Sequence, residues 1–258
     1  MGFGLKHLTR LITQSGLGLL LLIWGTLPAM AGGFTQPQGN TFTSFSFFTF
    51  GTDSFSKQEI QLYLEHGLQD YLTLIVKSPY TWSEDKGDNN QGFSEQELGL
   101  RWRFNRDSTL ATAIQGILIL PLGYDSDEDP TLGNQAVGVE LSLPVSQGFQ
   151  VGQQRYGYGT VEVGYRDYLS SESELRLSGE ISVDVSKRFA IATQFYGIYR
   201  LQSTEDDFSR IGGQLRWRPN SDLTLVVGGY TNISGEGGGI ESQIWYTFKP
   251  RPQEPGGN

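Results

Sequence analysis

The sequence predicts an all-β fold: an antiparallel, up-and-down transmembrane β-barrel of about twelve strands. Three observations support this prediction. Long segments alternate strictly between apolar and polar residues, tight turns alternate with longer acidic loops, and the chain has 34 glycines and no cysteine. A closed sheet pairs every backbone N–H and C=O without disulfide bonds, which is the condition that hydrocarbon imposes on a spanning protein.

Residues 1–31 have the features of a secretory signal peptide. Lys6 and Arg10 give a positive start, an apolar run over 17–24 follows, and a small-residue cleavage site ends at Ala31. The alternative is a transmembrane anchor, but the strong apolar run is too short for a hydrocarbon core of ~30 Å. The sequence therefore predicts Sec-type export with cleavage near Ala31. Without the two leader cations, 17 basic and 28 acidic residues remain, which disfavours nucleic acid and anionic lipid surfaces as partners.

One eleven-residue stretch occurs twice. Leu100–Leu110 returns as Leu215–Leu225, with eight of eleven positions identical. In each copy an aliphatic residue, Arg, Trp and Arg alternate before a turn that contains Asn and Asp. Period-two alternation places successive side chains on opposite faces of a strand. We therefore expect one transmembrane hairpin used twice, with its Trp toward lipid near the interface and its arginines toward the lumen.

The same alternation predicts twelve strands in total. Their lengths suit tilted membrane-crossing strands better than the ~5–6 residues usual in soluble sheets, which favours a barrel over a soluble exported sandwich. In the first of them phenylalanines fall on both faces, so its phase stays open. Residues 144–156 are too long for a tight turn and are left open between a further strand and a small plug. The predicted strands are 40–51, 57–67, 71–82, 94–104, 109–121, 135–143, 157–168, 174–185, 189–202, 208–218, 222–233 and 239–248.

The connections divide into two classes. Tight turns are expected at 67–70, 105–108, 186–188 and 219–222, and longer, more acidic loops at 83–93, 123–134, 203–207 and 234–239. Short turns on one side and longer loops on the other are typical of outer-membrane barrels, in which the short turns face the periplasm. The even strand number places both termini on that side. The domain prediction is a barrel over 32–248 and a disordered, Pro- and Gly-rich periplasmic tail over 249–258. Aromatic residues near strand ends are expected to form interfacial girdles: Tyr80, Trp82, Trp102, Phe104, Tyr165, Trp217, Tyr246 and Phe248.

Three short motifs carry a resemblance. The segment 33–39 before an aromatic-rich first strand, the two Leu-Arg-Trp-Arg hairpins, and the tetrapeptide 163–166 resemble the outer-membrane transporter family associated with the meta-pathway of phenol degradation. This resemblance covers the mature chain and implies passage of small molecules, with aromatic compounds as the solutes proposed for the family. The strand ending at Phe248 is similar to the closing strand read by the barrel-assembly machinery, although a ten-residue tail follows it.

The alternation assigns a mixed set of charges to the lumen. Nine cations against seven carboxylates nearly cancel, which predicts a polar conduit without strong ion selectivity. The alternative is that these side chains pair across strands and partly fill a narrow lumen. The candidate lumen-lining residues are Lys77, Glu97, Arg101, Arg103, Glu140, Glu162, Arg166, Arg176, Glu180, Arg200, Arg210, Arg216, Arg218 and Glu241, with Glu65 and Asp184 assigned to the same faces.

No catalytic, cofactor or metal site is predicted. His66 is the only histidine after the leader, and it falls beside a tight turn, which disfavours the His-dependent chemistry of outer-membrane phospholipases and proteases. No spacing singles out the carboxylate pair that a glycosidase needs. The loop 125–130 lacks the glycine and the distant glutamate of a calcium loop, and 235–239 lacks the Lys-Ser/Thr of a phosphate loop.

The sequence therefore predicts a porin-like transporter of a Gram-negative outer membrane, for passive or weakly selective passage of small polar or aromatic solutes. The alternative is a plugged structural or adhesin-like surface barrel that acts through acidic extracellular loops. The expected partners are outer-membrane lipid and lipopolysaccharide, the barrel-assembly machinery during biogenesis, and a small-molecule solute. The sequence determines neither the solute, nor the open or plugged state of the lumen, nor the oligomeric state.

Overall fold

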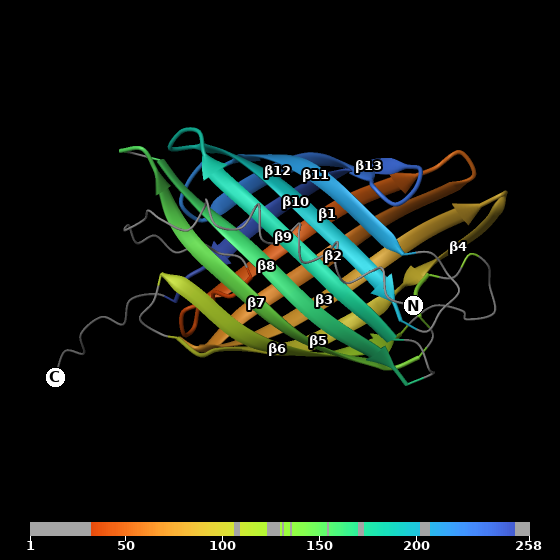
Figure 1. The fold of residues 1–258 in the computed structure, drawn as a ribbon, viewed down its shortest axis with the longest axis horizontal. Coiled ribbons are helices and arrows are strands. Elements are labelled where there is room, and N and C mark those ends of the chain that lie inside the picture. The colour runs from red at the N-terminus through yellow and green to blue at the C-terminus, as the bar shows by residue number, and fades with distance from the viewer. Residues whose placement is uncertain are drawn as a thin grey trace, which may run out of the picture.

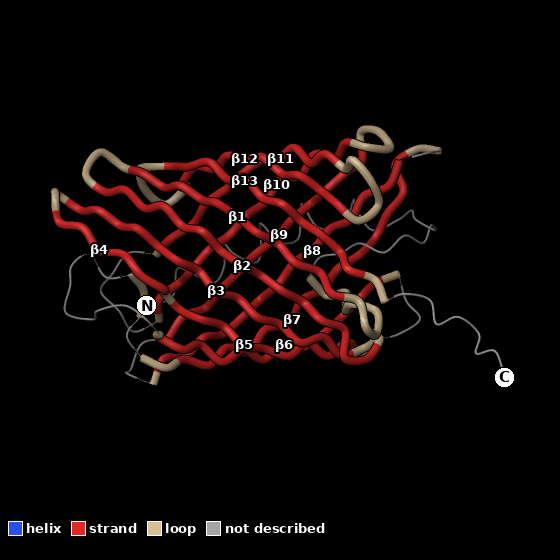
Figure 2. Tube along the Cα trace, turned by 180° about the vertical axis from the view of Figure 1, so that it is seen from behind, coloured by secondary structure: helices blue, strands red, loops and turns tan. Residues whose placement is uncertain are grey.

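The computed structural model describes residues 32–105, 109–122, 130, 132–134, 136–153, 155–169, 173–201 and 207–250. Within these ranges thirteen strands form one closed antiparallel sheet (Figures 1 and 2). None of the described segments forms a helix long and apolar enough to cross a membrane. The predicted signal peptide, residues 106–108 of a predicted turn, most of the predicted loop 123–134, residues 203–206 and most of the predicted tail lie outside the described residues. The strands are β1 (Thr41–Gly51), β2 (Phe55–Gln69), β3 (Leu72–Asp85), β4 (Asp88–Phe93), β5 (Glu95–Arg103), β6 (Leu110–Pro121), β7 (Gly138–Val151), β8 (Arg155–Tyr168), β9 (Ser173–Asp184), β10 (Phe189–Arg200), β11 (Phe208–Trp217), β12 (Leu223–Asn232) and β13 (Gly238–Phe248).

These thirteen segments correspond to twelve barrel strands. β4 and β5 are separated only by Ser94, and both pair with β3, so together they take the place of one strand in the barrel wall. The remaining strands pair with their sequence neighbours, and the ring closes where Thr41 of β1 lies opposite Phe248 of β13. The prediction of an all-β, antiparallel, up-and-down barrel of about twelve strands is confirmed.

The prediction of an acidic loop over 83–93 is wrong, because this stretch is a hairpin that extends the wall. β3 continues to Asp85, and β4 pairs back against it from Asp88. Lys86 and Gly87 join them with φ values of 52° and 99°. Positive φ at both central residues is typical of a type I′ turn, whose twist matches that of the flanking strands. The hairpin projects beyond the rest of the rim (Figure 1).

The stretch 144–156 is strand rather than plug. β7 continues through it to Val151, β8 begins at Arg155, and Val151 lies opposite Arg155. The pairing of Val151 with Arg155 therefore replaces the long connection expected from the sequence. Gly152, at φ 66°, supplies the left-handed conformation that the turn after Val151 needs. The sequence signal was weak because Pro144 interrupts an otherwise alternating run.

The two faces of the wall reverse the arrangement of a soluble protein. In β5, Leu98, Leu100 and Trp102 are about half exposed on the outside, whereas Glu97 and Arg101 are buried inside. The same holds for the second copy of the repeat, in which Trp217 is exposed outside and Arg216 is buried. An apolar outer band around a polar interior is the arrangement of a barrel that crosses lipid.

The open phase of the first strand is settled by its neighbours. Phe42, Ser44 and Ser46 are buried inside, and Phe48 and Phe50 continue the same face and line the lumen. Phe45 is exposed on the outside. Aromatic side chains therefore stand on both faces of β1.

Candidate functional site

The lumen of the described barrel contains several cavities. The central cavity, of about 730 Å³, is lined by residues from nearly every strand of the barrel. An outer cavity of about 790 Å³ lies toward the β3–β4 hairpin and shares Lys57, Lys77 and Arg166 with the central cavity. A side cavity of about 280 Å³ and a turn-end cavity of about 200 Å³ lie along β8–β13. The first two volumes are in the range that small organic molecules occupy in proteins.

The structure places thirteen of the fourteen predicted lumen residues on these cavities. Arg103 is the exception among the described residues, because its Nε donates to Asn105 O at 2.8 Å and its guanidinium lies 5.3 Å from the Phe34 ring centre. The central cavity is lined by Lys77, Glu97, Arg101, Glu140, Glu162, Arg166, Arg176, Arg200 and Arg210, the side cavity also by Glu180 and Glu241, and the turn-end cavity by Arg216 and Arg218.

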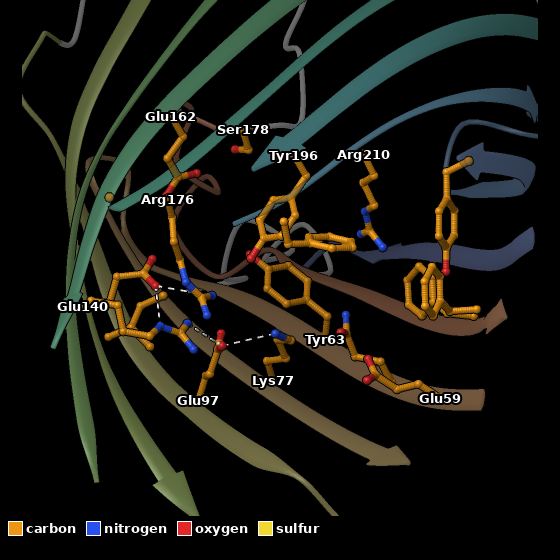
Figure 3. Close-up of a pocket in the computed structure, with 18 of the residues that line it drawn as sticks. Glu59, Tyr63, Lys77, Glu97, Glu140, Glu162, Arg176, Ser178, Tyr196 and Arg210 are labelled. Atoms are coloured by element: carbon orange, nitrogen blue, oxygen red, sulfur yellow. Dashed lines mark hydrogen bonds and ion pairs between the residues drawn. The ribbon is translucent and has the colours of Figure 1, made fainter. Parts of the chain in front are cut away.

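Arg166 is the centre of a charge cluster that joins strands across the lumen. Its guanidinium contacts three carboxylates, those of Glu95 at 2.8 Å, Glu97 at 2.9 Å and Glu140 at 2.8 Å. Glu97 also contacts Lys77 Nζ at 3.1 Å (Figure 3). A different guanidinium nitrogen contacts each carboxylate, so the three contacts together fix the plane of the guanidinium as well as its charge. The cluster therefore ties β3 and β5 to β7 and β8 through the lumen.

Arg176 continues the cluster toward the opening. Its guanidinium lies 3.7 Å from Glu140 and 2.9 Å from Glu174, and Arg200 lies 4.0 Å from the same Glu174. Figure 3 shows Arg176 projecting into the cavity beside Glu140. Because most cations here have a carboxylate partner, the charged wall carries little net charge.

The segment before β1 lies inside the barrel at the end that carries the tight turns. Gly33 N donates to Ser146 Oγ at 2.8 Å, and Gln36 donates to Thr73 Oγ1 and Glu65 Oε2, both at 2.8 Å. Because these partners belong to β2, β3 and β7, the segment follows the inner wall from the seam across half of the barrel. It therefore narrows that end of the lumen.

Arg101 joins this segment to the wall. One of its nitrogens contacts Glu65 at 2.8 Å and Phe34 O at 3.1 Å, and its Nε donates to Gln115 Oε1 at 2.9 Å. The first arginine of the repeat thus cross-links the N-terminal segment to β2 and β6 inside the barrel.

Arg216, the equivalent residue of the second copy, organises the other half of the same end. Its guanidinium contacts Glu180 at 2.7 Å, hydrogen-bonds to Tyr158 Oη at 2.5 Å, and lies 4.7 Å from the Trp245 ring centre. Gln214 accepts from Arg216 and donates to Glu241 at 2.7 Å. This network separates the side cavity from the turn-end cavity.

An aromatic wall faces the charge cluster across the central cavity. The Phe50 ring lies 6.1 Å from that of Phe55 on one side and 6.5 Å from that of Phe208 on the other, and Tyr196 continues the row 6.5 Å from Phe208. Arg210 stands at the end of this row. The central cavity is therefore two-sided, with paired charges on one wall and aromatic rings on the other.

Sequence reasoning missed several of these residues. Glu95 and Glu174 have the inward phase of their strands, so the alternation that identified Glu97 and Arg176 would have found them too. Tyr158 and Tyr196 gave no signal, because a tyrosine suits a lipid interface as well as a polar lumen.

The described residues include no group of three or more His, Asp or Glu side chains placed to hold a metal ion. His66 Nδ1 is 2.8 Å from Thr41 Oγ1 at the turn end, in a contact that joins β2 to β1.

No protein-family model matches the chain, and no curated protein matches it in sequence. Solved structures do match its shape. An outer membrane channel from Pseudomonas putida F1 superposes with a TM-score of 0.63 at 15% identity, over 87% of this chain and all of that one. The NanC porin gives 0.53 at 10% identity over 81% and 100%, and the KdgM porin 0.52 at 12% over 80% and 99%. This chain therefore has the fold of the small outer-membrane channel barrels.

Proposed function

We propose that this protein is a porin-like channel of a bacterial outer membrane, for passive or weakly selective passage of small polar or aromatic solutes. The observation that supports this most is the pair of large cavities, which share lining residues and together extend from the β3–β4 end to the middle of the barrel. A polar lumen inside an apolar band allows water and solute to cross a layer that excludes both. The solved channels with the same fold add to the case.

The proposal includes the placement of the protein. The leader directs export and is removed near Ala31, the barrel-assembly machinery inserts the chain, and the tight turns face the periplasm. The aromatic pairs Trp102–Phe104 and Tyr246–Phe248, with ring centres 5.1 and 4.5 Å apart, support an interface at that end. The opposite rim then faces outward, toward lipopolysaccharide.

Weak selectivity is proposed because the lumen charges are largely paired. Paired side chains present dipoles rather than a single-sign ring, and rings of one sign are what gives channels strong ion selectivity. The segment inside the turn end and the Arg216 network set the narrowest passage, so we propose a small solute-size limit.

Single-channel recording in planar bilayers tests the proposal. We expect discrete conductance steps from the purified, folded protein and a reversal potential close to zero in a salt gradient. Folding is verified by heat-modifiable gel migration, so that a silent preparation is not mistaken for a silent channel. A folded protein that never conducts would defeat the channel proposal and favour the plugged surface barrel.

A further inference from the structure

Arg210 differs from the other lumen cations. In the described part of the chain no carboxylate lies within ion-pair distance of its guanidinium, whereas Lys57, Lys77 and Arg176 each have one. Its contacts are instead with two rings, since its Cζ lies 5.3 Å from the centre of Tyr196 and 4.6 Å from that of Tyr230. A cation held by rings keeps its full charge and fork of N–H donors for a further partner.

The strand pairing builds this arrangement. Tyr196 of β10 lies directly opposite Arg210 of β11, and Tyr230 of β12 lies opposite Gly212, the next inward-facing position. A Cβ atom at Gly212 would come within 3.0 Å of Tyr230 Cβ and 2.9 Å of Gly229 O. Gly212 therefore leaves room for the Tyr230 ring beside the arginine. The Tyr230 hydroxyl donates to Thr49 O at 2.6 Å, which anchors that ring to β1.

The guanidinium stands where two spaces meet. Arg210 and both tyrosines line the central cavity of about 730 Å³ and also the side cavity of about 280 Å³. Figure 3 shows Arg210 and Tyr196 projecting into the central cavity, opposite Lys77 and Glu97. A small solute in the central cavity therefore has direct access to a guanidinium that no described carboxylate pairs.

The neighbouring surface defines the rest of the ligand. The row formed by Phe50, Phe55 and Phe208 begins beside Tyr196 and faces the same cavity. An apolar or flat body covers such rings favourably, and a carboxylate matches the fork of a guanidinium in a bidentate contact. We propose that Arg210, between Tyr196 and Tyr230, is a binding site for small carboxylates that carry an apolar or aromatic body.

This inference deepens the proposed function, because it names the solute class that such a channel would hold on its path. Titration calorimetry on the full, detergent-folded protein with sodium benzoate tests it without any need for current. We expect benzoate to bind, and Arg210→Gln to weaken it about 10-fold or more, since hydrogen bonds to a charged group are lost. Benzamide, which has the same shape without the charge, and acetate, which lacks the ring, should each bind at least about 10-fold more weakly than benzoate.

Lys57→Gln is the matched control, because it removes one positive charge from the same cavity but from a cation that Glu59 already pairs at 3.1 Å. It should leave benzoate binding within about 3-fold of the wild type, since a paired, partly exposed charge contributes little. Arg210→Lys keeps the charge without the fork and should bind benzoate more weakly than the wild type, and it replaces Arg210→Gln if the latter does not show heat-modifiable folding.

Three results overturn the inference: no benzoate binding to the wild type, equal binding by the Arg210 variants, or equal binding of benzamide. Equal binding of acetate overturns the part assigned to the rings. A protein that binds benzoate through Arg210 but carries no current defeats the channel proposal and leaves this site standing. A protein that conducts but does not bind benzoate defeats the site alone.

Discussion

Arg101 and Arg216 occupy the same position of the sequence repeat, and each buries its guanidinium in the lumen against one glutamate. Arg101 contacts Glu65 at 2.8 Å, and Arg216 contacts Glu180 at 2.7 Å. Their other partners differ, because Arg101 holds the backbone of the N-terminal segment and Arg216 holds Tyr158 and Gln214. The same local sequence motif thus supplies two buried arginines that cross-link different parts of the lumen.

Arg216→Met should destabilise the barrel strongly. Removing one member of a buried pair leaves the other charge unpaired, which costs about 3–5 kcal/mol in the free energy of unfolding. Urea unfolding of the barrel in lipid vesicles, followed by tryptophan fluorescence, measures this value. The double variant with Glu180→Gln removes the orphaned charge and should recover part of the loss. If the double variant is no more stable than Arg216→Met, the ion pair is not the source of the effect.

The lipid face should respond to charge according to depth. Ile181 of β9 is more than half exposed on the outside and lies opposite Thr193, which is four residues further from the turn end than Phe189. Phe189 begins β10 at the turn end. We expect Ile181→Arg to cost about 2–4 kcal/mol and Phe189→Arg about 0–1 kcal/mol, because arginine is least tolerated at the bilayer midplane. Unfolding in lipid vesicles provides the comparison. Equal costs at the two positions would contradict the proposed position of the membrane on the wall.

The N-terminal segment should limit conductance. Refolded protein that begins at residue 39 lacks the stretch that contacts Ser146, Thr73 and Glu65, so the turn end becomes wider. We expect a larger single-channel conductance than for protein that begins at Gly32. Gln36→Ala removes the side-chain hydrogen bond to Glu65 and keeps the backbone hydrogen bond to Thr73. It should give more frequent current fluctuations with the full segment present. An unchanged conductance after the deletion would show that the narrowest passage lies elsewhere.

Ion selectivity should depend on charge inside the lumen and not on charge at the rim. Arg176→Glu changes the charge of the central cavity by two units and should shift the reversal potential toward cation preference in a salt gradient. Arg188→Glu makes the same change in the exposed turn before β10, where salt screens it beyond about 10 Å at 0.1 M. Equal shifts from both variants would mean that Arg176 does not stand on the ion path.

The barrel could be predicted from the sequence, because period-two alternation identifies the strands. Their even number places both termini at one end, and the need to pair every backbone group in hydrocarbon then requires a closed sheet. The Leu-Arg-Trp-Arg strands identify which face meets lipid, since Trp102 and Arg101 differ so strongly in solvent preference. Alternation was less informative where one residue suits either face. The phenylalanines of β1 and the tyrosines of β10 and β12 are of this kind, and only pairing with neighbouring strands fixed their direction.

The contacts within the lumen were not accessible. Arg166 contacts Glu97, which is 69 residues away in the sequence. Which inward-facing charges come into contact depends on the relative register of strands that are not adjacent in the barrel. The path of residues 32–39 was also beyond reach, because an irregular segment has no periodicity and its position follows from side chains on β2, β3 and β7 that are brought together only by closure.

The seam between β1 and β13 has a consequence for how the molecule is made. Thr41 and Phe248 are partners at a separation of 207 residues, so β1 can complete its backbone pairing on this side only after β13 is present. Until then both edges offer unpaired backbone, which cannot enter hydrocarbon and invites association with other chains. A nascent or prematurely terminated polypeptide therefore has no stable half-product, and assembly is a single late event whose rate is limited by this long-range closure.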